Sequence, residues 1–295
     1  MAEFLMVIIG GLKIGAIYAL AAIGLIVIHK ATKTVNFAHG GLVMLGAFAA
    51  YLIVVELNWP YWLAYVLIPI LIGIVATLLE ITILRPLRRA DLFIVIVATI
   101  FLGIALSETF RLAQNTEMLA VPAAIKGPPM MLELGEDLII ITREQIWVCL
   151  GALTVGVIGL LIFRYAPAGR SMRAMAANVR GAQLCGYSVN RVYAIAWFVG
   201  GALAGLAGVF AAPSHGVSPE LAISVITAAF VAAVIGGFDS LLGAIIGGLL
   251  LGLAETLSAA YVSSAMKSAV SFLLLFVVLL WRPEGLFPEA KGRDV

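Results

Sequence analysis

A short polar run, TVNFAHGG at positions 34–41, separates two long apolar stretches near the start of the chain. Asn36 supplies an amide and His39 an imidazole, and either group can bond a polar molecule or a backbone carbonyl. In a structural role, Asn36 would cap the following helix and His39 would bond a neighbouring carbonyl. In a functional role, the run would line a route for a solute. The candidates for that second role are Asn36, Phe37, His39 and Gly40.

Ionisable side chains also occur inside or near apolar runs, at Lys13, Glu80, Glu108, Glu255 and Lys267. A charge at the centre of a bilayer costs at least about 2.5–3.5 kcal/mol, so such groups face a protein interior, a cavity or a partner. Glu255 and Lys267 could pair across neighbouring helices, and Glu108 could pair with Arg111 three residues later. The sequence has no chain of carboxylates and histidines resembling a proton relay. This weakens an ion-coupled mechanism.

Motifs for enzymatic chemistry are not found. The sequence has no G-x-x-x-x-G-K-[ST] phosphate loop, no H-E-x-x-H and no G-x-S-x-G elbow. His29, His39 and His215 are far apart, and Cys149 and Cys185 have no disulfide or metal-ligand spacing. We therefore expect no catalytic residue, no cofactor and no metal. If the protein moves a solute uphill, another chain must supply the energy.

Membrane helices must position these residues. Of the 295 residues, 63% are apolar and 12% are charged, against about 45–50% and about 25% in soluble domains. A helix needs about 20 apolar residues to cross a bilayer, and such runs recur along the chain. The composition predicts an all-α, polytopic transmembrane bundle of 8–9 spans, some interrupted, in one domain over 1–295. A net charge of +2 gives no indication of nucleic-acid binding.

Nine segments are candidate spans: 4–28, 37–56, 61–84, 92–112, 146–164, 192–212, 221–236, 241–258 and 266–281. Only GGFD separates the seventh from the eighth, so these two could also be halves of a broken helix, which would leave eight spans. Gly236, Gly237 and Asp239 would then line the pathway. Alternatively they form a plain turn, with Asp239 or Ser240 capping the next helix.

Basic residues favour one end of these spans. If the N-terminus is outside, only Arg111, Lys126 and Arg143 fall on the outer face, whereas most of the 18 basic residues fall on the other. Basic residues in short loops stay in the cytoplasm. The distribution therefore predicts an outer N-terminus and a cytoplasmic C-terminus.

The longest stretch outside the spans is the outer loop 113–145, which contains prolines and acidic residues. Its LIIIT run could form a short strand. Because loops so often contain binding residues, this one is either an ordinary surface loop or a docking surface for an outside partner.

The cytoplasmic loop 166–191 is predicted to contain a short basic helix. Alanine, methionine and leucine favour a helix from Met172 to Leu184, with Ser171 as its cap and Gly186 at its end. The loop either simply follows the charge rule or docks a helix into a groove on another protein.

Several motifs resemble the LivH-type permeases of ABC importers for branched-chain amino acids. The opening GLKIGAIYALAAIGLIVIHKATKTVNFAHGGLVMLGAF, then RPLRRA, IGGFDSLLGAIIGG and RPEGLF, follow the family's pattern over nearly the whole chain. Tyr187 departs from it, since the family usually has Ile there, and so do Lys30 and Lys33. The matching residues of the cytoplasmic loop are Gly169, Arg170, Met172, Arg173, Ala174, Asn178, Ala182 and Gly186.

The resemblance implies a multi-pass permease subunit of a bacterial inner (plasma) membrane, without enzymatic activity. Its implied partners are a second homologous permease subunit, two cytoplasmic ATP-binding subunits, an extracytoplasmic solute-binding protein and membrane lipid. The matched loop residues would then couple the permease to the ATP-binding subunits. The implied cargo is a branched-chain or other hydrophobic amino acid. The alternatives are urea or a short amide moved by the same machinery, and a stand-alone secondary transporter or channel.

Overall fold

A computed structural model describes residues 2–114, 118–134 and 137–287 of the chain. Within these residues, nine helical segments are long and apolar enough to cross a membrane. This confirms the predicted helical bundle with nine spans. The α-helices are α1 (Ala2–Thr32), α2 (His39–Tyr51), α3 (Tyr61–Leu79), α4 (Leu92–Gln114), α5 (Arg143–Tyr165), α6 (Pro167–Ala177), α7 (Val179–Leu184), α8 (Val189–His215), α9 (Pro219–Gly236), α10 (Leu241–Tyr261) and α11 (Lys267–Trp281).

Shorter helical segments extend or join these helices. π-helical turns continue α2 over Leu52–Glu56 and α3 over Glu80–Leu84. 3₁₀ turns at Pro86–Arg89 and Ser264–Met266 lead into α4 and α11.

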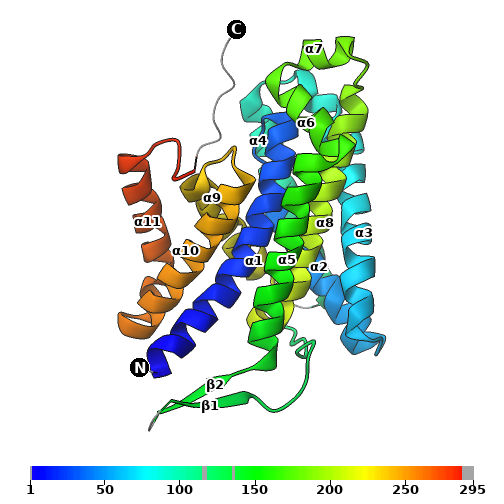
Figure 1. The fold of residues 1–295 in the computed structure, drawn as a ribbon. Coiled ribbons are helices and arrows are strands. Elements are labelled where there is room, and N and C mark those ends of the chain that lie inside the picture. The colour runs from blue at the N-terminus through cyan, green and yellow to red at the C-terminus, as the bar shows by residue number, and fades with distance from the viewer. Residues whose placement is uncertain (1, 115–117, 135–136, 288–295) are drawn as a thin grey trace.

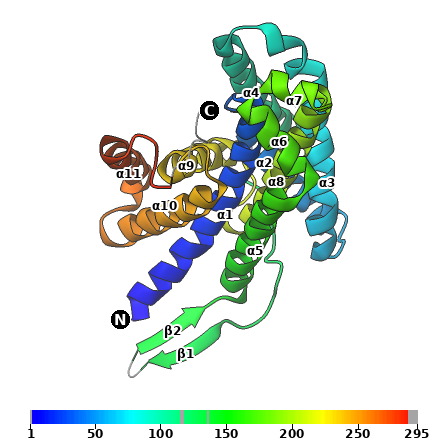
Figure 2. The same ribbon diagram turned by 45° about the horizontal axis from the view of Figure 1, so that its top comes forward.

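The bundle has two distinct ends (Figure 1). The hairpin end holds the start of α1 and an antiparallel hairpin of β1 (Met130–Leu134) and β2 (Asp137–Ile141). The α6–α7 end holds α6, α7 and the α9–α10 turn. The hairpin projects past α5 beside the start of α1 (Figure 2). It confirms the strand predicted for LIIIT.

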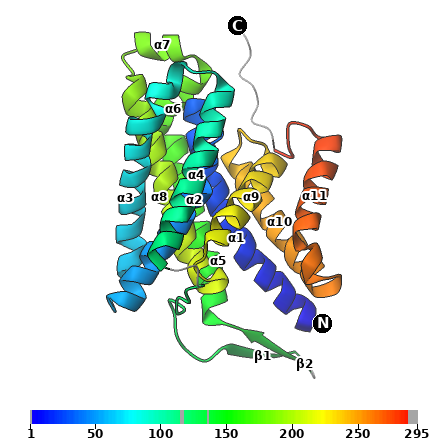
Figure 3. The same ribbon diagram turned by 180° about the vertical axis from the view of Figure 1, so that it is seen from behind.

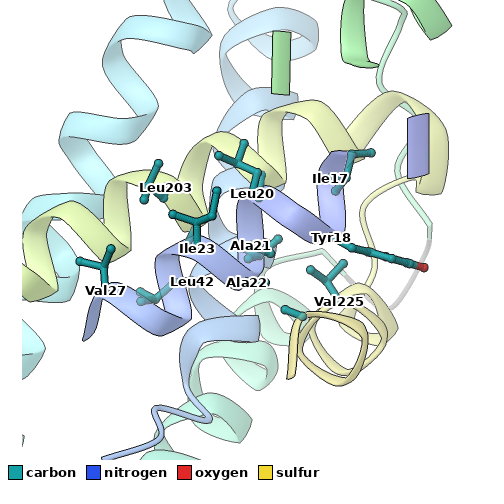
Figure 4. Packing of buried hydrophobic residues seen from close by; sticks show 14 of the residues in the cluster. Ile17, Tyr18, Leu20, Ala21, Ala22, Ile23, Val27, Leu42, Leu203 and Val225 are labelled. Carbon is teal, nitrogen blue, oxygen red and sulfur yellow. The ribbon is translucent and has the colours of Figure 1, made fainter. Parts of the chain in front are cut away.

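The core surrounds α1, which packs against α5, α8, α9 and α10. Its middle, from Ala16 to Ile28, is almost fully buried. Figure 4 shows Leu20 and Ile23 of α1 gathered with Leu42 of α2 and Leu203 of α8. α1 is therefore enclosed by protein over much of its length.

α2 begins partway down α1, not at its end. His39, its first residue, has its Nε2 2.9 Å from the carbonyl oxygen of Ala21. α1 continues for eleven residues beyond Ala21 to Thr32, which is about 16 Å at 1.5 Å per residue. The chain between Thr32 and His39 must therefore turn back by about this distance, and α2 begins near the middle of the bundle.

The returning segment satisfies its backbone with nearby side chains. The N–H of Phe37 donates to Oγ1 of Thr99 at 3.2 Å, and that of Ala38 donates to Oδ1 of Asn36 at 3.0 Å. Non-helical backbone survives at membrane depth only when protein or trapped water supplies such partners. The predicted cap is wrong in its position. Ala38 is the N-cap of α2 and has no side-chain cap among the described residues, because two turn residues separate Asn36 from the helix.

The cytoplasmic-loop helix also differs from its prediction. Two helices, α6 and α7, replace the single helix, because Asn178 adopts an extended backbone and its Oδ1 accepts from the N–H of Gly181 at 2.9 Å. α6 starts at Pro167, whose fixed φ suits the first helical position. Ser171 is thus inside the helix, where its Oγ donates to the carbonyl of Ala168. Gly186, at φ +85°, follows the end of α7, as predicted.

Candidate translocation pathway

One face of α9 is open and polar. Glu220, Ile223, Ser224 and Thr227 follow the i, i+3, i+4, i+7 spacing of a single helix face. The first three are exposed and Thr227 is half-buried, whereas most other α9 residues are buried. The Thr227 hydroxyl donates to the carbonyl of Ile223 at 2.8 Å. A carboxylate on an open membrane helix needs water, a ligand or a protein partner beside it.

Two cavities flank this face. Figure 3 shows the helices α4, α9 and α11, whose residues line them. The α4–α9 cavity has a volume of about 400 Å³, and the α9–α11 cavity has about 530 Å³. Glu220 and Ile223 line both. The open face of α9 therefore forms a wall common to the two cavities.

The start of α2 and the C-terminal half of α4 complete the α4–α9 cavity. Gly40 contributes because it has no side chain. A Cβ there would stand 2.2 Å from the carbonyl oxygen of Ala222, so only glycine lets α2 meet α9 this closely. The full lining is Phe37, Gly40, Gly41, Ile100, Gly103, Ile104, Ser107, Glu108, Arg111, Pro219, Glu220, Ala222, Ile223 and Ile226.

A polar cluster lies at the α9–α11 cavity. The carboxylate of Glu255, which is buried, accepts hydrogen bonds from the hydroxyls of Tyr18 at 2.9 Å and Ser271 at 2.5 Å. Lys267 Nζ lies 3.4 Å from the same carboxylate. This confirms the predicted pair of Glu255 and Lys267. α1, α10 and α11 are thus joined by charge and hydrogen bonds at membrane depth.

The other three ionisable residues singled out from the sequence, Lys13, Glu80 and Glu108, are also paired. Glu80 is buried and contacts both Arg85 and Arg88. Lys13 contacts Glu144 at 3.1 Å. The predicted pair of Glu108 and Arg111 is present at 3.7 Å, with each side chain about half exposed.

Of the TVNFAHGG residues, Phe37, Gly40 and Gly41 line the α4–α9 cavity. Asn36 and His39 are buried and do not belong to the lining of the described cavities. Asn36 accepts a hydrogen bond within the turn before α2, and His39 lies against α1. This geometry matches the structural role considered for these residues and not the role of lining a route for a solute.

Gly236, Gly237 and Asp239 lie at the α9–α10 turn, and neither cavity includes them. Ser240, not Asp239, caps α10 by accepting from the N–H of Gly243 at 3.0 Å. Asp239 instead pairs with Lys33 at 3.5 Å. α9 and α10 are two separate helices that are each long enough to span a membrane. The GGFD segment is therefore a plain turn and not the break in an interrupted helix.

The RPEGLF motif completes that turn. The N–H of Leu286 donates to the carbonyl of Ile235 at 2.8 Å, and that of Phe287 donates to Gly236 at 3.0 Å. These are carbonyls that a helix end leaves without internal partners. The C-terminal segment therefore caps α9.

The residues matched in the 166–191 loop fall into a buried and an exposed group. Gly169, Met172 and Ala182 are buried, and Ala174 is half-buried. Arg173 donates to the carbonyls of Phe163 and Arg164 at the end of α5, so it fixes α6 to α5. The exposed matched residues are Arg170, Asn178 and Gly186. Arg180 and Leu184, which are not among the matched residues, are also exposed in this loop.

The polar residues of α9 were not predicted. The signal was present in PELAISVIT, where Glu220, Ser224 and Thr227 recur on one helix face within an apolar run. Tyr18 and Ser271 gave no such signal, because each is a single polar residue in an apolar helix.

In the part of the chain that the structure describes, nine helices suited to crossing a membrane and a polar wall between two cavities define the class as a multi-pass membrane permease. The family model described as "Branched-chain amino acid transport system / permease component" matches residues 7–279. The chain belongs to this family.

Curated relatives agree with this assignment over almost the full length. The chain is 33% identical to the high-affinity branched-chain amino acid transport system permease protein LivH of Escherichia coli (strain K12), covering 98% of this chain and 97% of the relative. It is 32% identical to the permease protein BraD of Pseudomonas aeruginosa, covering 98% of each. Among solved structures, "PsaBC from Streptococcus pneumoniae in complex with Fab" aligns with a TM-score of 0.50 at 12% identity, covering 94% of this chain and 91% of the other. That likeness concerns the fold alone.

Proposed function

We propose that this chain is the membrane permease subunit of an ATP-driven ABC importer that moves branched-chain or other hydrophobic amino acids across a bacterial inner (plasma) membrane. The main structural support is the open face of α9, where Glu220, Ser224 and Thr227 stand between two cavities. Such a face suits a water-filled route and is poorly suited to lipid. The printed names of the relatives supply the cargo class.

A second permease subunit is the proposed cover for this face. Lys267 is 36% exposed on its side-chain surface although it lies at the start of a membrane helix. A homologous subunit facing α9 and α11 would enclose both cavities and leave a route between the two chains.

Two cytoplasmic ATP-binding subunits are proposed to contact the α6–α7 end. Arg170, Arg180 and Leu184 project there, and Leu184 is 90% exposed. An apolar side chain flanked by arginines suits a groove on a partner. Arg173, which fixes α6 to α5, would transmit movement of α6 to the bundle.

The extracytoplasmic solute-binding protein is assigned to the hairpin end. There Met131, Leu132 and Leu138 are exposed on the β1–β2 hairpin. This arrangement corresponds to an outer N-terminus and a cytoplasmic C-terminus.

Reconstitution tests the proposal. Liposomes containing the permease pair and ATP-binding subunits, with ATP inside and binding protein outside, should accumulate labelled leucine only while ATP is hydrolysed. Leucine movement by the purified chain alone, driven by an ion gradient, would contradict the proposal. Competition by excess urea, but not by isoleucine, would point to the amide alternative.

A matched pair of leucines tests the ATPase contact. Leu184→Asp should prevent co-purification of the ATP-binding subunits, because it places a charge on the exposed apolar contact. Leu57→Asp, at a position 54% exposed after α2, should leave co-purification unchanged. Equal recovery with both variants would remove the α6–α7 end from the interface.

A further inference from the structure

We infer that the α4–α9 cavity binds the zwitterion of a branched-chain amino acid, with Arg111 holding the carboxylate and Glu220 the ammonium group. The inference rests on the proposed function for the cargo class. The location and the residue roles come from the cavity itself.

The cavity has a suitable size and a suitable division of polarity. Its volume of about 400 Å³ falls within the roughly 300–1,000 Å³ of small-molecule sites, which are mostly apolar with a few convergent polar groups. The aliphatic part of its lining is Ile100, Ile104, Ile223 and Ile226.

The two long walls run from polar to apolar in the same direction. On α4, Arg111 lies near the helix end, and Ile104 and Ile100 lie two and three turns deeper. On α9, which runs the opposite way, Glu220 lies in the first turn and Ile223 and Ile226 follow. Both walls therefore present charge at the hairpin end and aliphatic side chains toward the middle of the bundle. An amphiphilic solute with one charged end and one branched apolar end matches this order.

The charged end offers both signs. Arg111 meets Glu108 at 3.7 Å, with side chains 46% and 48% exposed, so this is a loose and solvated pair. A guanidinium has five N–H donors in a planar fork that fits a carboxylate. Glu220 lines the cavity beside it, at the N-terminus of α9, where the helix dipole favours the ionised carboxylate. A zwitterion can thus place each of its charges against a group of opposite sign.

The start of α2 closes one side of the cavity. Phe37, just before α2, and Gly40 and Gly41, in its first turn, belong to the lining. A Cβ on Gly41 would stand 2.9 Å from Cβ of Leu106, and a Cβ on Gly103 would stand 3.1 Å from the Phe37 carbonyl. α2 therefore packs directly on α4 as well as α9 and forms the wall between them. A solute in the cavity cannot pass between α4 and α9 on this side unless α2, α4 or α9 moves.

The α9–α11 cavity lacks these properties. Its lysine, Lys267, already faces Glu255, and its lining is rich in hydroxyl groups. Its lining includes no arginine, so it offers no planar guanidinium fork for a carboxylate.

Alkylation protection tests the site in the assembled transporter in nanodiscs. Cys149→Ala and Cys185→Ser remove the two cysteines of the chain, and this background must retain ATP-dependent leucine uptake. Ile104→Cys then reports on the α4–α9 cavity, and Ser224→Cys, which lines only the α9–α11 cavity, is the matched control. The reagent is a water-soluble maleimide.

We expect leucine to slow alkylation of Ile104→Cys but not of Ser224→Cys. Leucinamide, which lacks the carboxylate, and 4-methylpentanoate, which lacks the ammonium group, should protect much less. Arg111→Gln should raise the leucine concentration for half-protection by about tenfold or more, because a charge-assisted bond is lost. Arg111→Lys should retain part of the protection, and Glu220→Gln should make leucine and 4-methylpentanoate equivalent.

Three results would overturn the site. They are an unreactive Ile104→Cys in the assembled transporter, equal protection of both reporters, and unchanged protection in Arg111→Gln that still assembles. In each case continued leucine uptake by the background would leave the proposed function intact. Absence of ATP-dependent leucine uptake by the wild-type transporter would instead refute the proposed function, and this site with it.

Discussion

Replacement of Glu255 by alanine should destabilise the protein through the hydroxyl group of Tyr18. That hydroxyl donates to the Glu255 carboxylate at 2.9 Å, and the Tyr18 side chain is buried at 3% exposure. Ser271 differs, because its hydroxyl can turn to the carbonyl of Lys267 at 3.2 Å. Of these two hydroxyls, only that of Tyr18 is therefore left without an acceptor in Glu255→Ala.

The magnitude follows from these contacts. A buried donor without a partner costs about 1–3 kcal/mol. The ion pair with Lys267, whose side chain is 36% exposed, adds at most about 1 kcal/mol. We expect Glu255→Ala to lower the free energy of unfolding by about 1–4 kcal/mol. Adding Tyr18→Phe should recover at least about 1 kcal/mol, because it removes the stranded donor.

SDS titration of the protein in dodecylmaltoside, followed by circular dichroism, measures these differences. Tyr51→Phe is the matched control, because Tyr51 bonds Glu56 at 2.8 Å in an exposed position. It should change the free energy of unfolding by less than about 0.5 kcal/mol. If the double variant is no more stable than Glu255→Ala, the stranded hydroxyl does not explain the loss.

Two further substitutions test packing and capping. Gly236→Ala should lower the thermal midpoint in detergent, because its Cβ would stand 2.1 Å from the carbonyl oxygen of Gly243; overpacking of this kind costs about 1–3 kcal/mol. Gly10→Ala, whose nearest neighbour would be 3.8 Å away, should behave as wild type, and an equal loss in both would contradict the explanation. Thr142→Ala should cost about 1 kcal/mol in the same SDS titration, because it breaks the capping box with Gln145 at the start of α5. Thr142→Ser should restore stability, and failure to do so would show that the hydroxyl is not the cause.

Hydropathy and charge were sufficient to predict the spans, because a helix needs about 20 apolar residues to cross a bilayer. They did not predict where α2 begins. The apolar run 37–56 indicates how long the second span is, but not at what depth in the bundle it begins. That depth depends on His39 reaching Ala21 and on Thr99 accepting the N–H of Phe37, which are contacts between residues distant in sequence.

The divided loop helix has a local cause that propensity alone hides. Alanines and methionines around Asn178 favour a helix, whereas asparagine competes for nearby backbone N–H groups and so prefers a cap. The competing bond to Gly181 prevails. Similarly, pairing of Glu255 with Lys267 could be predicted from the cost of lone charges in lipid. The shared contact with Tyr18 could not, because it depends on how α1 packs against α10.

Capping of α9 by Leu286 and Phe287 has a consequence for biosynthesis. The helix bearing the polar wall cannot complete its last hydrogen bonds until residues 286 and 287 have left the ribosome. A chain truncated before this segment would leave the Ile235 and Gly236 carbonyls without these partners, and we expect the last turn of α9 to fray in it.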